Sequence, residues 1–378
     1  MSPRPIRASV LVVDDDAGVL RAARRVLAGK YDVASASSPE QALATARQIE
    51  LDLAVLDIRM PTMDGFELMQ LLKADQPDLD VILMTGSMTE PDAHLIQAIQ
   101  QGAFYFVQKP FDRQVLQTLV ERCLELRRLR ALADRELRKL RTAQNQLLPQ
   151  VAPADARYEI AFRYRPFYFA TGDYHGFFPQ PDDRLAVFVG DSSGHGPSAC
   201  MLMATMRTLL HAQPALPPDP GDALSRLNRL ACDLFPESLF MTAVYLTLGG
   251  HGAVQWAAAG QHPPLRIAGT GQAAARTAGM AGLPLGIDAD QAYKSTEWRL
   301  DPGERLLVFT DGIVEASNTE GAMLSVKGLQ GFLHELSHED LKLEALVDSL
   351  VARVTDFMGG SDFEDDFTVL AIERRKGE

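Results

Sequence analysis

Hydrophobic positions over residues 8 to 112 form short unbroken runs that alternate with segments of helical spacing. Apolar residues three or four positions apart predict helices over Pro39–Ile49, Phe66–Asp75 and Asp92–Gln101. The runs between them predict five strands, namely Ala8–Val13, Tyr31–Ser35, Leu51–Leu56, Val81–Met84 and Ala103–Val107. Strands buried on both faces read as continuous apolar runs, so this alternation predicts an α/β domain with a five-stranded parallel sheet covered by helices.

The pattern changes between Asp112 and Gln146, where no Pro or Gly interrupts a long helical repeat. Apolar residues recur at alternating spacings of three and four, as in a heptad repeat whose a and d positions are apolar. Eight of the ten heptad positions are apolar, the set being Leu116, Leu119, Cys123, Leu126, Arg130, Ala133, Leu137, Leu140, Gln144 and Leu147. This repeat predicts a coiled-coil linker that joins two copies into a homodimer. The alternative is one long helix that packs on its own domain.

From about residue 155 to residue 374 the strand-like and helix-like segments are grouped. Helices are predicted over Ala199–His211, Asp222–Leu234 and Leu343–Met358, and a loop over Gly269–Gly282. The predicted strands are Tyr158–Tyr164, Leu185–Val189, Met241–Leu248, Ala253–Ala258, Arg305–Phe309 and Thr368–Ile372. Grouped strands and helices indicate an α+β layered domain. The chain therefore divides into a first domain (1–112), a helical linker (113–150) and a second domain (151–378).

Composition and charge narrow the class of protein. The 378 residues are 46% hydrophobic and carry a net charge of −13, so two cores can form and broad electrostatic binding to nucleic acid or anionic membrane is disfavoured. No uncharged apolar run approaches the roughly 20 residues that cross a bilayer, and the first apolar run ends at Asp14, too early for a signal peptide. Cys123, Cys200 and Cys232 have no metal or disulfide spacing. We expect a soluble cytoplasmic protein with reduced thiols, without a nucleic-acid or membrane partner.

Polar side chains follow four predicted strands of the first domain. Asp14 and Asp15 follow the first strand, Asp57 the third, Thr85 the fourth and Lys109 the fifth. In a parallel sheet the active crevice lies outside the carboxyl ends of the strands. A carboxylate can accept a phosphoryl group when a divalent cation offsets the crowded negative charge and neighbouring acids supply its oxygen ligands. The alternative is that the acids cap strand ends and the lysine is a surface charge.

With Met60–Gly65 after the third strand and Pro110–Phe111 after the fifth, residues 8 to about 120 resemble the receiver domain of two-component response regulators. The resemblance implies a flavodoxin-like fold and a cognate histidine kinase that phosphorylates Asp57. It implies that Thr85 and Phe106 are switch residues and that Lys109 contacts phosphate. It also implies a Mg²⁺ site formed by Asp14, Asp15, Asp57 and Arg59.

Acids gather a second time in the C-terminal domain, each beside small residues. They are Asp173 after Gly172, Asp191 at the start of Asp-Ser-Ser-Gly-His-Gly, Asp311 before Gly312, and Asp365 before the last strand. Carboxylates suit hard cations, and two ions about 3.5–4 Å apart can activate water for in-line attack on phosphorus. No Ser-His-Asp or Cys-His arrangement recurs, which favours metal-assisted hydrolysis over a covalent intermediate.

Together with Gln146–Pro149, Gly282–Gly286 and Pro302–Arg305, these motifs resemble the metal-dependent protein Ser/Thr phosphatases of the PPM or type 2C family, in its bacterial sporulation and stress-regulator branch. The resemblance implies a β-sandwich flanked by helices that binds two Mn²⁺ or Mg²⁺ ions. The implied ligands are Asp173, the bridging Asp191, the Ser192 carbonyl, Asp311 and Asp365, with Asp191 and Asp311 central to catalysis. The implied substrate is phospho-Ser/Thr on an anti-sigma-factor antagonist-like protein.

Three departures from the family pattern bear on activity. Gly176 stands where a second acid is usual, Gln261 where His is usual, and Met323–Val326 where Phe-Gly is usual. A second hypothesis is therefore a phosphatase-fold adaptor that binds a sigma-factor regulator without hydrolysis. A DNA-binding regulator fits poorly, since no helix-turn-helix segment follows the first domain. His175 is left open between a role beside the metal site and simple exposure.

Overall fold

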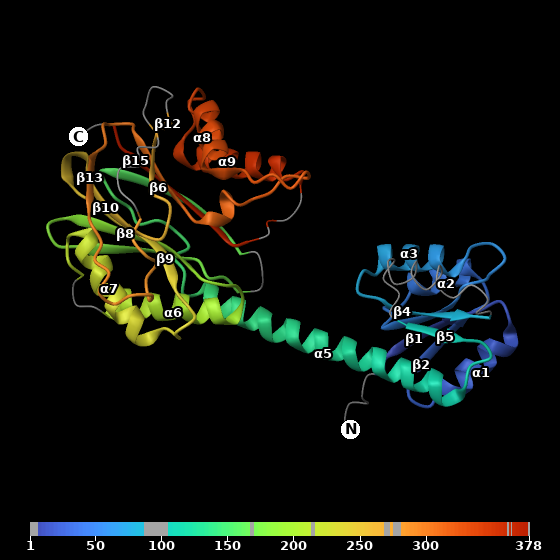
Figure 1. Ribbon diagram of the computed structural model, residues 1–378. Helices are drawn as coiled ribbons and strands as arrows, with labels where there is room; N and C mark the ends of the chain where they lie inside the picture. The colour runs from blue at the N-terminus through green and yellow to red at the C-terminus, as the bar shows by residue number, and fades with distance from the viewer. Residues whose placement is uncertain are drawn as a thin grey trace. The chain divides into compact units, whose positions relative to one another are not determined.

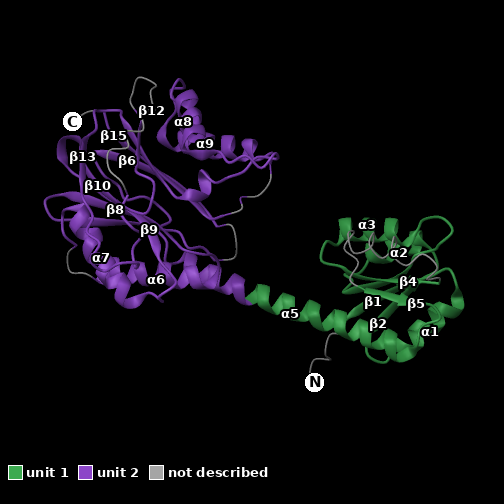
Figure 2. Cartoon of the chain, viewed as in Figure 1, with its two compact units in different colours: residues 1–135 green, residues 136–378 purple. Residues whose placement is uncertain are grey.

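The computed structural model describes residues 7–86, 105–166, 170–212, 216–267, 273–274, 281–360, 363 and 365–376. These form two compact units, Met1–Arg135 and Glu136–Glu378, which Figure 2 distinguishes by colour. The predicted helix Asp92–Gln101 and the first two residues of the predicted strand Ala103–Val107 lie outside the described residues.

The first unit contains a five-stranded parallel sheet in the order β2-β1-β3-β4-β5. Its elements are β1 (Ser9–Val13), α1 (Ala17–Leu27), β2 (Asp32–Ala36), α2 (Pro39–Ala46), β3 (Leu53–Asp57), α3 (Gly65–Asp75), β4 (Asp80–Thr85) and β5 (Tyr105–Gln108). The sheet confirms the flavodoxin-like α/β class. Helix α1 was not predicted.

Both faces of this sheet are buried, which explains the continuous apolar runs. Val10 and Val12 of β1 pack with α1 and the start of α5, whereas Leu11 and Val13 pack with α2 and α3. Successive residues of a strand point to opposite faces, so a strand covered on both sides needs apolar residues at every position. The polar residues are thereby left to the strand ends, where the candidate site lies.

Helix α5 (Arg113–Asn145) begins in the first unit and ends in the second. Its start is capped by Asp112, whose Oδ1 accepts hydrogen bonds from the backbone nitrogens of Gln114 and Val115 at 2.7 and 3.2 Å. Its buried residues lie towards its two ends, at Leu116, Val120, Cys123 and Gln144. Its middle exposes three leucines: Leu126 (36%), Leu129 (55%) and Leu132 (53%). The a and d positions near both ends of α5 are therefore buried against other residues of the same chain.

The second unit contains two antiparallel five-stranded sheets, in the orders β13-β10-β9-β8-β7 and β12-β11-β14-β15-β6. The strands are β6 (Tyr158–Arg165), β7 (Tyr174–Gln180), β8 (Arg184–Ser192), β9 (Met241–Leu248), β10 (Ala253–Ala259), β11 (Leu265–Ile267), β12 (Ala273–Ala274), β13 (Thr296–Arg299), β14 (Arg305–Phe309) and β15 (Phe367–Arg374). The six predicted strands are present. The predicted loop Gly269–Gly282 contains the two-residue strand β12, and most of its remainder lies outside the described residues.

The two sheets face each other across an apolar core that includes Val187, Leu246, Leu306 and Ile372. Each outer face is covered by helices (Figure 1): α6 (Pro197–Ala212) and α7 (Pro220–Leu234) on one sheet, α8 (Ser325–Leu336) and α9 (Leu343–Phe357) on the other. Two short 3₁₀ turns, η1 (Gly250–Gly252) and η2 (Asp311–Ile313), complete the unit. This arrangement confirms the α+β layered class. Of the helices that the structure describes, none is long and apolar enough to cross a bilayer.

Candidate functional site

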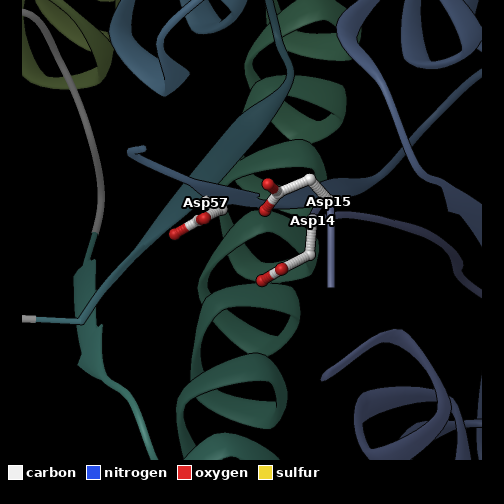
Figure 3. Close-up of side chains that lie close together, drawn as sticks. All are labelled: Asp14, Asp15 and Asp57. Atoms are coloured by element: carbon white, nitrogen blue, oxygen red, sulfur yellow. The ribbon is translucent and has the colours of Figure 1, made fainter. Parts of the chain in front are cut away.

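The first candidate site is a group of three carboxylates at the carboxyl edge of the parallel sheet. Asp14 and Asp15 follow β1 and Asp57 ends β3, and Figure 3 shows that their side chains lie close together. One oxygen from each lies within 4.8 Å of the others. Asp14 and Asp57 are buried, whereas Asp15 is exposed. An all-oxygen donor set with one open side fits Mg²⁺, which retains several waters when it binds proteins.

Lys109 completes this group from the residue after β5. Its Nζ lies 2.6 Å from Asp14 Oδ2 and 2.8 Å from Asp57 Oδ1. Burial raises the pKa of Asp57, and the hydrogen bond from Lys109 opposes that rise. Burial works to lower the pKa of Lys109, but the hydrogen bonds to Asp14 and Asp57 outweigh it and the pKa is raised. Lys109 is therefore a fixed positive charge beside the predicted phosphoacceptor.

The loop after Asp57 turns back against it because of Gly65. A Cβ on Gly65 would collide with the carbonyl oxygen of Asp57. Asp64 caps α3, its Oδ1 accepting hydrogen bonds from the backbone nitrogens of Phe66 and Glu67 at 2.8 Å. The Met60–Gly65 motif is thus a turn that needs an N-cap and a residue without a side chain. The exposed Arg59 lies at its start.

The remaining predicted receiver residues lie on the two neighbouring strands. Thr85 is the last residue of β4, and its carbonyl accepts a hydrogen bond of 2.7 Å from the backbone nitrogen of Lys109. Phe106 lies in β5 and is half-buried against the core that α2 and α3 cover. Asp57, Thr85 and Lys109 therefore stand at the ends of three adjacent strands.

The four acids of the second unit come from both sheets of the sandwich. Asp173 precedes β7, Asp191 and Ser192 end β8, Asp311 follows β14, and Asp365 precedes β15. Burial raises the pKa of Asp191, and the charges of the other three acids raise it further, so the four lie within electrostatic reach. These four acids are less tightly grouped than the three receiver acids. Among the described residues, only Asp14, Asp15 and Asp57 have ligand atoms that all lie within 4.8 Å of one another.

Asp173 has the most unusual surroundings. It is fully buried, and its Oδ2 accepts hydrogen bonds from the hydroxyls of Thr310 (2.9 Å) and Thr368 (2.6 Å). Its Oδ1 has no donor among the described residues, and the carboxyl group of Asp191 lies within hydrogen-bonding range. Burial raises the pKa of Asp173. A buried carboxylate that has one oxygen without a donor and lies within hydrogen-bonding range of a second carboxylate fits a cation bound between the two.

Gly172 allows the two acid-bearing segments to approach. A Cβ at this position would lie 2.9 Å from the Ser192 carbonyl oxygen and 3.2 Å from Asp191 Oδ1. The Gly172 carbonyl accepts the Ser192 hydroxyl at 3.0 Å, and the Gly172 nitrogen donates to Asp366 Oδ2 at 2.9 Å. The glycine beside Asp173 is therefore a packing requirement of the site.

Two further glycines shape the turn after Asp191. Gly194 and Gly196 have φ values of 82° and 77°, a left-handed conformation that other residues rarely adopt. They lead the chain from β8 into α6, and His195 between them is exposed. The Asp-Ser-Ser-Gly-His-Gly motif thus combines a predicted ligand with a tight connection between β8 and α6.

The three departures from the family pattern have different structural consequences. A Cβ at Gly176 would lie 2.7 Å from the Phe178 ring and 2.8 Å from the Tyr174 hydroxyl, so aromatic groups fill the place of a second acid. The buried Gln261 donates a 2.7 Å hydrogen bond from Nε2 to the Phe309 carbonyl, near Asp311. Ser325 has a φ of 62°, in the region that favours glycine.

Four residues with contacts to these segments were not assigned to the site from the sequence: Gln144, which was placed in the heptad repeat, Thr310, Asp366 and Thr368. Thr310 and Asp366 lie directly beside predicted ligands, in Thr-Asp-Gly and Asp-Asp-Phe-Thr, and that adjacency was a usable signal. His175 is buried rather than exposed, and its Nε2 lies 3.2 Å from the Pro149 carbonyl oxygen. Burial lowers the pKa of His175 to about 4.

Comparison with known families assigns both units. Residues 181–375, just over half of the chain, match the family described as stage II sporulation protein E (SpoIIE), and residues 10–121 match the response regulator receiver domain. The chain therefore belongs to the SpoIIE family. It carries a receiver domain followed by a PP2C-type phosphatase domain, as the sequence motifs predicted.

Individual relatives match one part or the other. The phosphoserine phosphatase RsbU of Bacillus subtilis is 26% identical over 235 residues, covering 61% of this chain and 68% of its own length. The regulatory protein DctD of Rhizobium meliloti is 39% identical over 145 residues, 38% of this chain. The chain spans 31% of DctD and 28% of the Escherichia coli regulator GlrR.

Solved structures agree on the fold of the second unit. The RsbU and RsbW domains of Rv1364c from Mycobacterium tuberculosis align with a TM-score of 0.52 at 25% identity, covering 62% of this chain and 64% of that one. The PP2C domain of SiaA from Pseudomonas aeruginosa aligns with a TM-score of 0.56 at 19% identity, covering 66% and 99%. At that identity the second alignment speaks for the fold alone.

Proposed function

We propose that this protein is a response regulator in which phosphorylation of Asp57 controls a Mn²⁺- or Mg²⁺-dependent phosphatase that hydrolyses phospho-Ser/Thr on a protein. The observation that carries the hydrolytic half is the buried Asp173, whose Oδ1 has no donor among the described residues and whose carboxyl group lies within hydrogen-bonding range of Asp191. The observation that supports the regulatory half is the group of Asp14, Asp15, Asp57 and Lys109.

In the receiver, a cognate histidine kinase would donate the phosphoryl group. An oxygen of Asp57 attacks phosphorus, and the phosphorus–nitrogen bond of the kinase phosphohistidine breaks. Asp14, Asp15, Asp57 and the Arg59 carbonyl would hold Mg²⁺, which offsets the negative charge when bound. Lys109 already contacts Asp57 Oδ1 and would pass from that oxygen to the phosphoryl group.

In the phosphatase domain, Asp191 would be the ligand shared by two metal ions, and the Ser192 carbonyl would be a further ligand. Asp173 would complete the ligands of one ion, and Asp311 and Asp365 those of the other. When bound, the ions would supply Lewis-acid activation of water and charge neutralisation at phosphate. The hydroxyls of Thr310 and Thr368 hold Asp173 Oδ2, which leaves Oδ1 for the metal.

The substrate is proposed to be a phosphorylated anti-sigma-factor antagonist-like protein in a partner-switching pathway. The similarity to a phosphoserine phosphatase over 61% of the chain supports a phosphoserine or phosphothreonine side chain. The acidic chain, net −13, favours a protein substrate over nucleic acid.

The connection between the domains is proposed to be a homodimeric coiled coil over the middle of α5. Of the heptad positions, Leu126 and Ala133 are exposed there, while Leu116 and Cys123 pack on the receiver. The dimer seam is therefore shorter than the five heptads that the sequence predicts, and runs from Leu126 to about Leu140.

The test is hydrolysis of an aryl phosphate and of a phosphothreonine peptide by wild type, Asp191→Ala and Asp311→Ala, in Mn²⁺ and in chelator. Activity that needs metal and both acids is the expected result. Addition of beryllium fluoride, which mimics a phosphoryl group on Asp57, should change that activity in wild type and leave Asp57→Ala unchanged.

One observation favours the adaptor as a second candidate: aromatic groups occupy the space beside Gly176 where the family pattern has an acid. An adaptor would show no metal-dependent turnover in either receiver state. Its partner would instead be retained by the full chain in a pull-down and released or captured on beryllium fluoride addition.

A further inference from the structure

The end of α5 and the four residues after it, residues 144–149, form a linker end that packs against the segment carrying Asp173. Gln144 is 2% exposed although its side chain is polar. Its Nε2 donates a hydrogen bond of 2.6 Å to the Thr171 carbonyl, and its Oε1 accepts one of 3.0 Å from the Thr171 nitrogen. One amide side chain thus satisfies both backbone groups of a residue two positions before a predicted metal ligand.

The linker end makes a second contact on the other side of the acid. His175, two positions after Asp173, lies with Nε2 3.2 Å from the Pro149 carbonyl. A carbonyl can only accept, so Nε2 carries the proton in this contact. The imidazole is buried and its ring lies 4.4 Å from that of Phe162. The linker end therefore holds the chain on both sides of Asp173.

Thr171 passes this constraint directly to the acid. Its hydroxyl accepts a hydrogen bond of 3.0 Å from the backbone nitrogen of Asp173. The next residue, Gly172, accepts a hydrogen bond from the Ser192 hydroxyl and donates one to the Asp366 carboxylate. A displacement of Thr171 would consequently move Asp173 relative to Asp191.

The linker end is also anchored to the body of the domain. Arg207 of α6 donates a 2.8 Å hydrogen bond from Nε to the Leu147 carbonyl. Leu148 is buried in the core beside Tyr174 and Met203. These contacts fix the linker end to the domain from a second side. A rotation or shift of the end of α5 would therefore displace Thr171 through its hydrogen bonds to Gln144.

We propose that Gln144 is a positioning residue that couples the linker helix to the phosphatase metal site. Its amide holds Thr171 so that Asp173 keeps its place beside Asp191. A Gln at a heptad position is unfavourable in a coiled coil, and this contact explains its presence there. The inference rests on the proposed function, in which Asp173 and Asp191 are metal ligands.

The test is equilibrium Mn²⁺ binding to the full chain, followed by the electron paramagnetic resonance signal of free Mn²⁺. Asp14→Asn and Asp15→Asn are introduced throughout to remove the receiver site. Gln144→Met keeps the side-chain volume but loses both hydrogen bonds, and Gln144→Ala is a second variant. Gln146→Ala is the matched control, because Gln146 is exposed two residues further on.

Loss of a residue that orients a metal ligand typically weakens metal affinity about 10- to 100-fold. We expect that loss in Gln144→Met and no change in Gln146→Ala. The concentration of Mn²⁺ that half-saturates aryl phosphate hydrolysis should rise by the same factor, while kcat at saturating Mn²⁺ recovers. A residue needed only for stability would lower the unfolding temperature without moving either Mn²⁺ value.

Two outcomes would overturn the coupling. One is a folded Gln144→Met, judged by the fluorescence of Trp256 and Trp298, whose Mn²⁺ affinity stays within about twofold of wild type. The other is an equal loss in Gln146→Ala. Asp191→Ala distinguishes a failure of the coupling from a failure of the proposed function. If Asp191→Ala also retains full Mn²⁺ affinity, the proposed phosphatase metal site is wrong.

Discussion

Single hydroxyl groups set the orientation of Asp173. Thr310 and Thr368 both donate to Oδ2, although they lie 137 and 195 residues away along the chain. Neither residue is charged, and neither would bind metal through its hydroxyl in this arrangement. Their effect is to fix which oxygen of the carboxylate remains available.

Thr368→Val should therefore weaken the metal site without unfolding the domain. The change keeps the branched shape and removes one of the two donors to Asp173 Oδ2, so we expect the half-saturating Mn²⁺ concentration for aryl phosphate hydrolysis to rise about tenfold. Thr355→Val is a suitable control, because this change also removes one hydrogen bond, from the Thr355 hydroxyl to the Val351 carbonyl in α9. Equal Mn²⁺ responses in the two variants would contradict the proposed orientation of Asp173.

The departure at Ser325 yields a prediction about stability. Ser325 begins α8 with a φ of 62°, where a Cβ costs roughly 1–2 kcal/mol, and glycine avoids that cost at some entropic expense in the unfolded chain. Ser325→Gly should raise the free energy of unfolding of the second unit by about 0.5–1 kcal/mol. Urea unfolding followed by tryptophan fluorescence measures this, and a decrease would show that the Ser325 hydroxyl matters more than the backbone conformation.

The sequence identified the acids but not the groups that orient them, for a physical reason. Asp57 and Asp191 stand at the ends of apolar strands, and that position can be read locally. The bonds from Thr368 to Asp173 and from Gln144 to Thr171 join residues 195 and 27 positions apart. Such pairings depend on how the sheets are stacked, which local patterns do not specify.

Among the elements, α5 shows most clearly what a heptad repeat leaves undecided. The same apolar spacing serves packing on the chain's own domain and packing on a second copy. Leu116 and Cys123 use the first option, and Leu126 remains exposed. The strands β7 and β13 and the helix α8 were not predicted. β7 contains His, Gly and Pro, which weaken the strand pattern.

Cys123 offers a direct measure of how α5 sits on the receiver. The thiol is fully buried, and burial raises its pKa from 9.0 to about 12. A raised pKa means that the reactive thiolate appears only at higher pH, so at pH 8 the thiolate fraction should be about a thousandfold below that of a thiol with pKa 9.0. Alkylation of a Cys200→Ala, Cys232→Ala variant should accordingly be very slow.

The matched measurement uses a variant that retains only Cys232, which is partly exposed. That thiol should react faster than Cys123 under native conditions, and the two should react alike in urea. Rapid native alkylation of Cys123 would mean that the start of α5 leaves the receiver surface readily.

At the scale of the whole molecule, the sequence predicted two domains of different class because their apolar patterns differ. Continuous runs in the first unit reflect a sheet covered on both faces. In the second unit each strand alternates between two cores, as Val187 and Phe188 of β8 show by facing the opposite sheet and the helices respectively. What local patterns could not supply is whether one copy of the chain or two make the functional protein.

Dimerisation through the middle of α5 gives the last prediction. Leu126 and Ala133 are heptad positions that are exposed in a single chain, so changing both to Glu should leave each unit folded while it places charges in the proposed seam. We expect sedimentation equilibrium to show a dimer for wild type and a monomer for the double variant at micromolar concentration. Leu71→Glu, on α3 and 44% exposed, should remain dimeric. A monomeric wild type would rule out the homodimer, and a dimeric double variant would place the interface outside this seam.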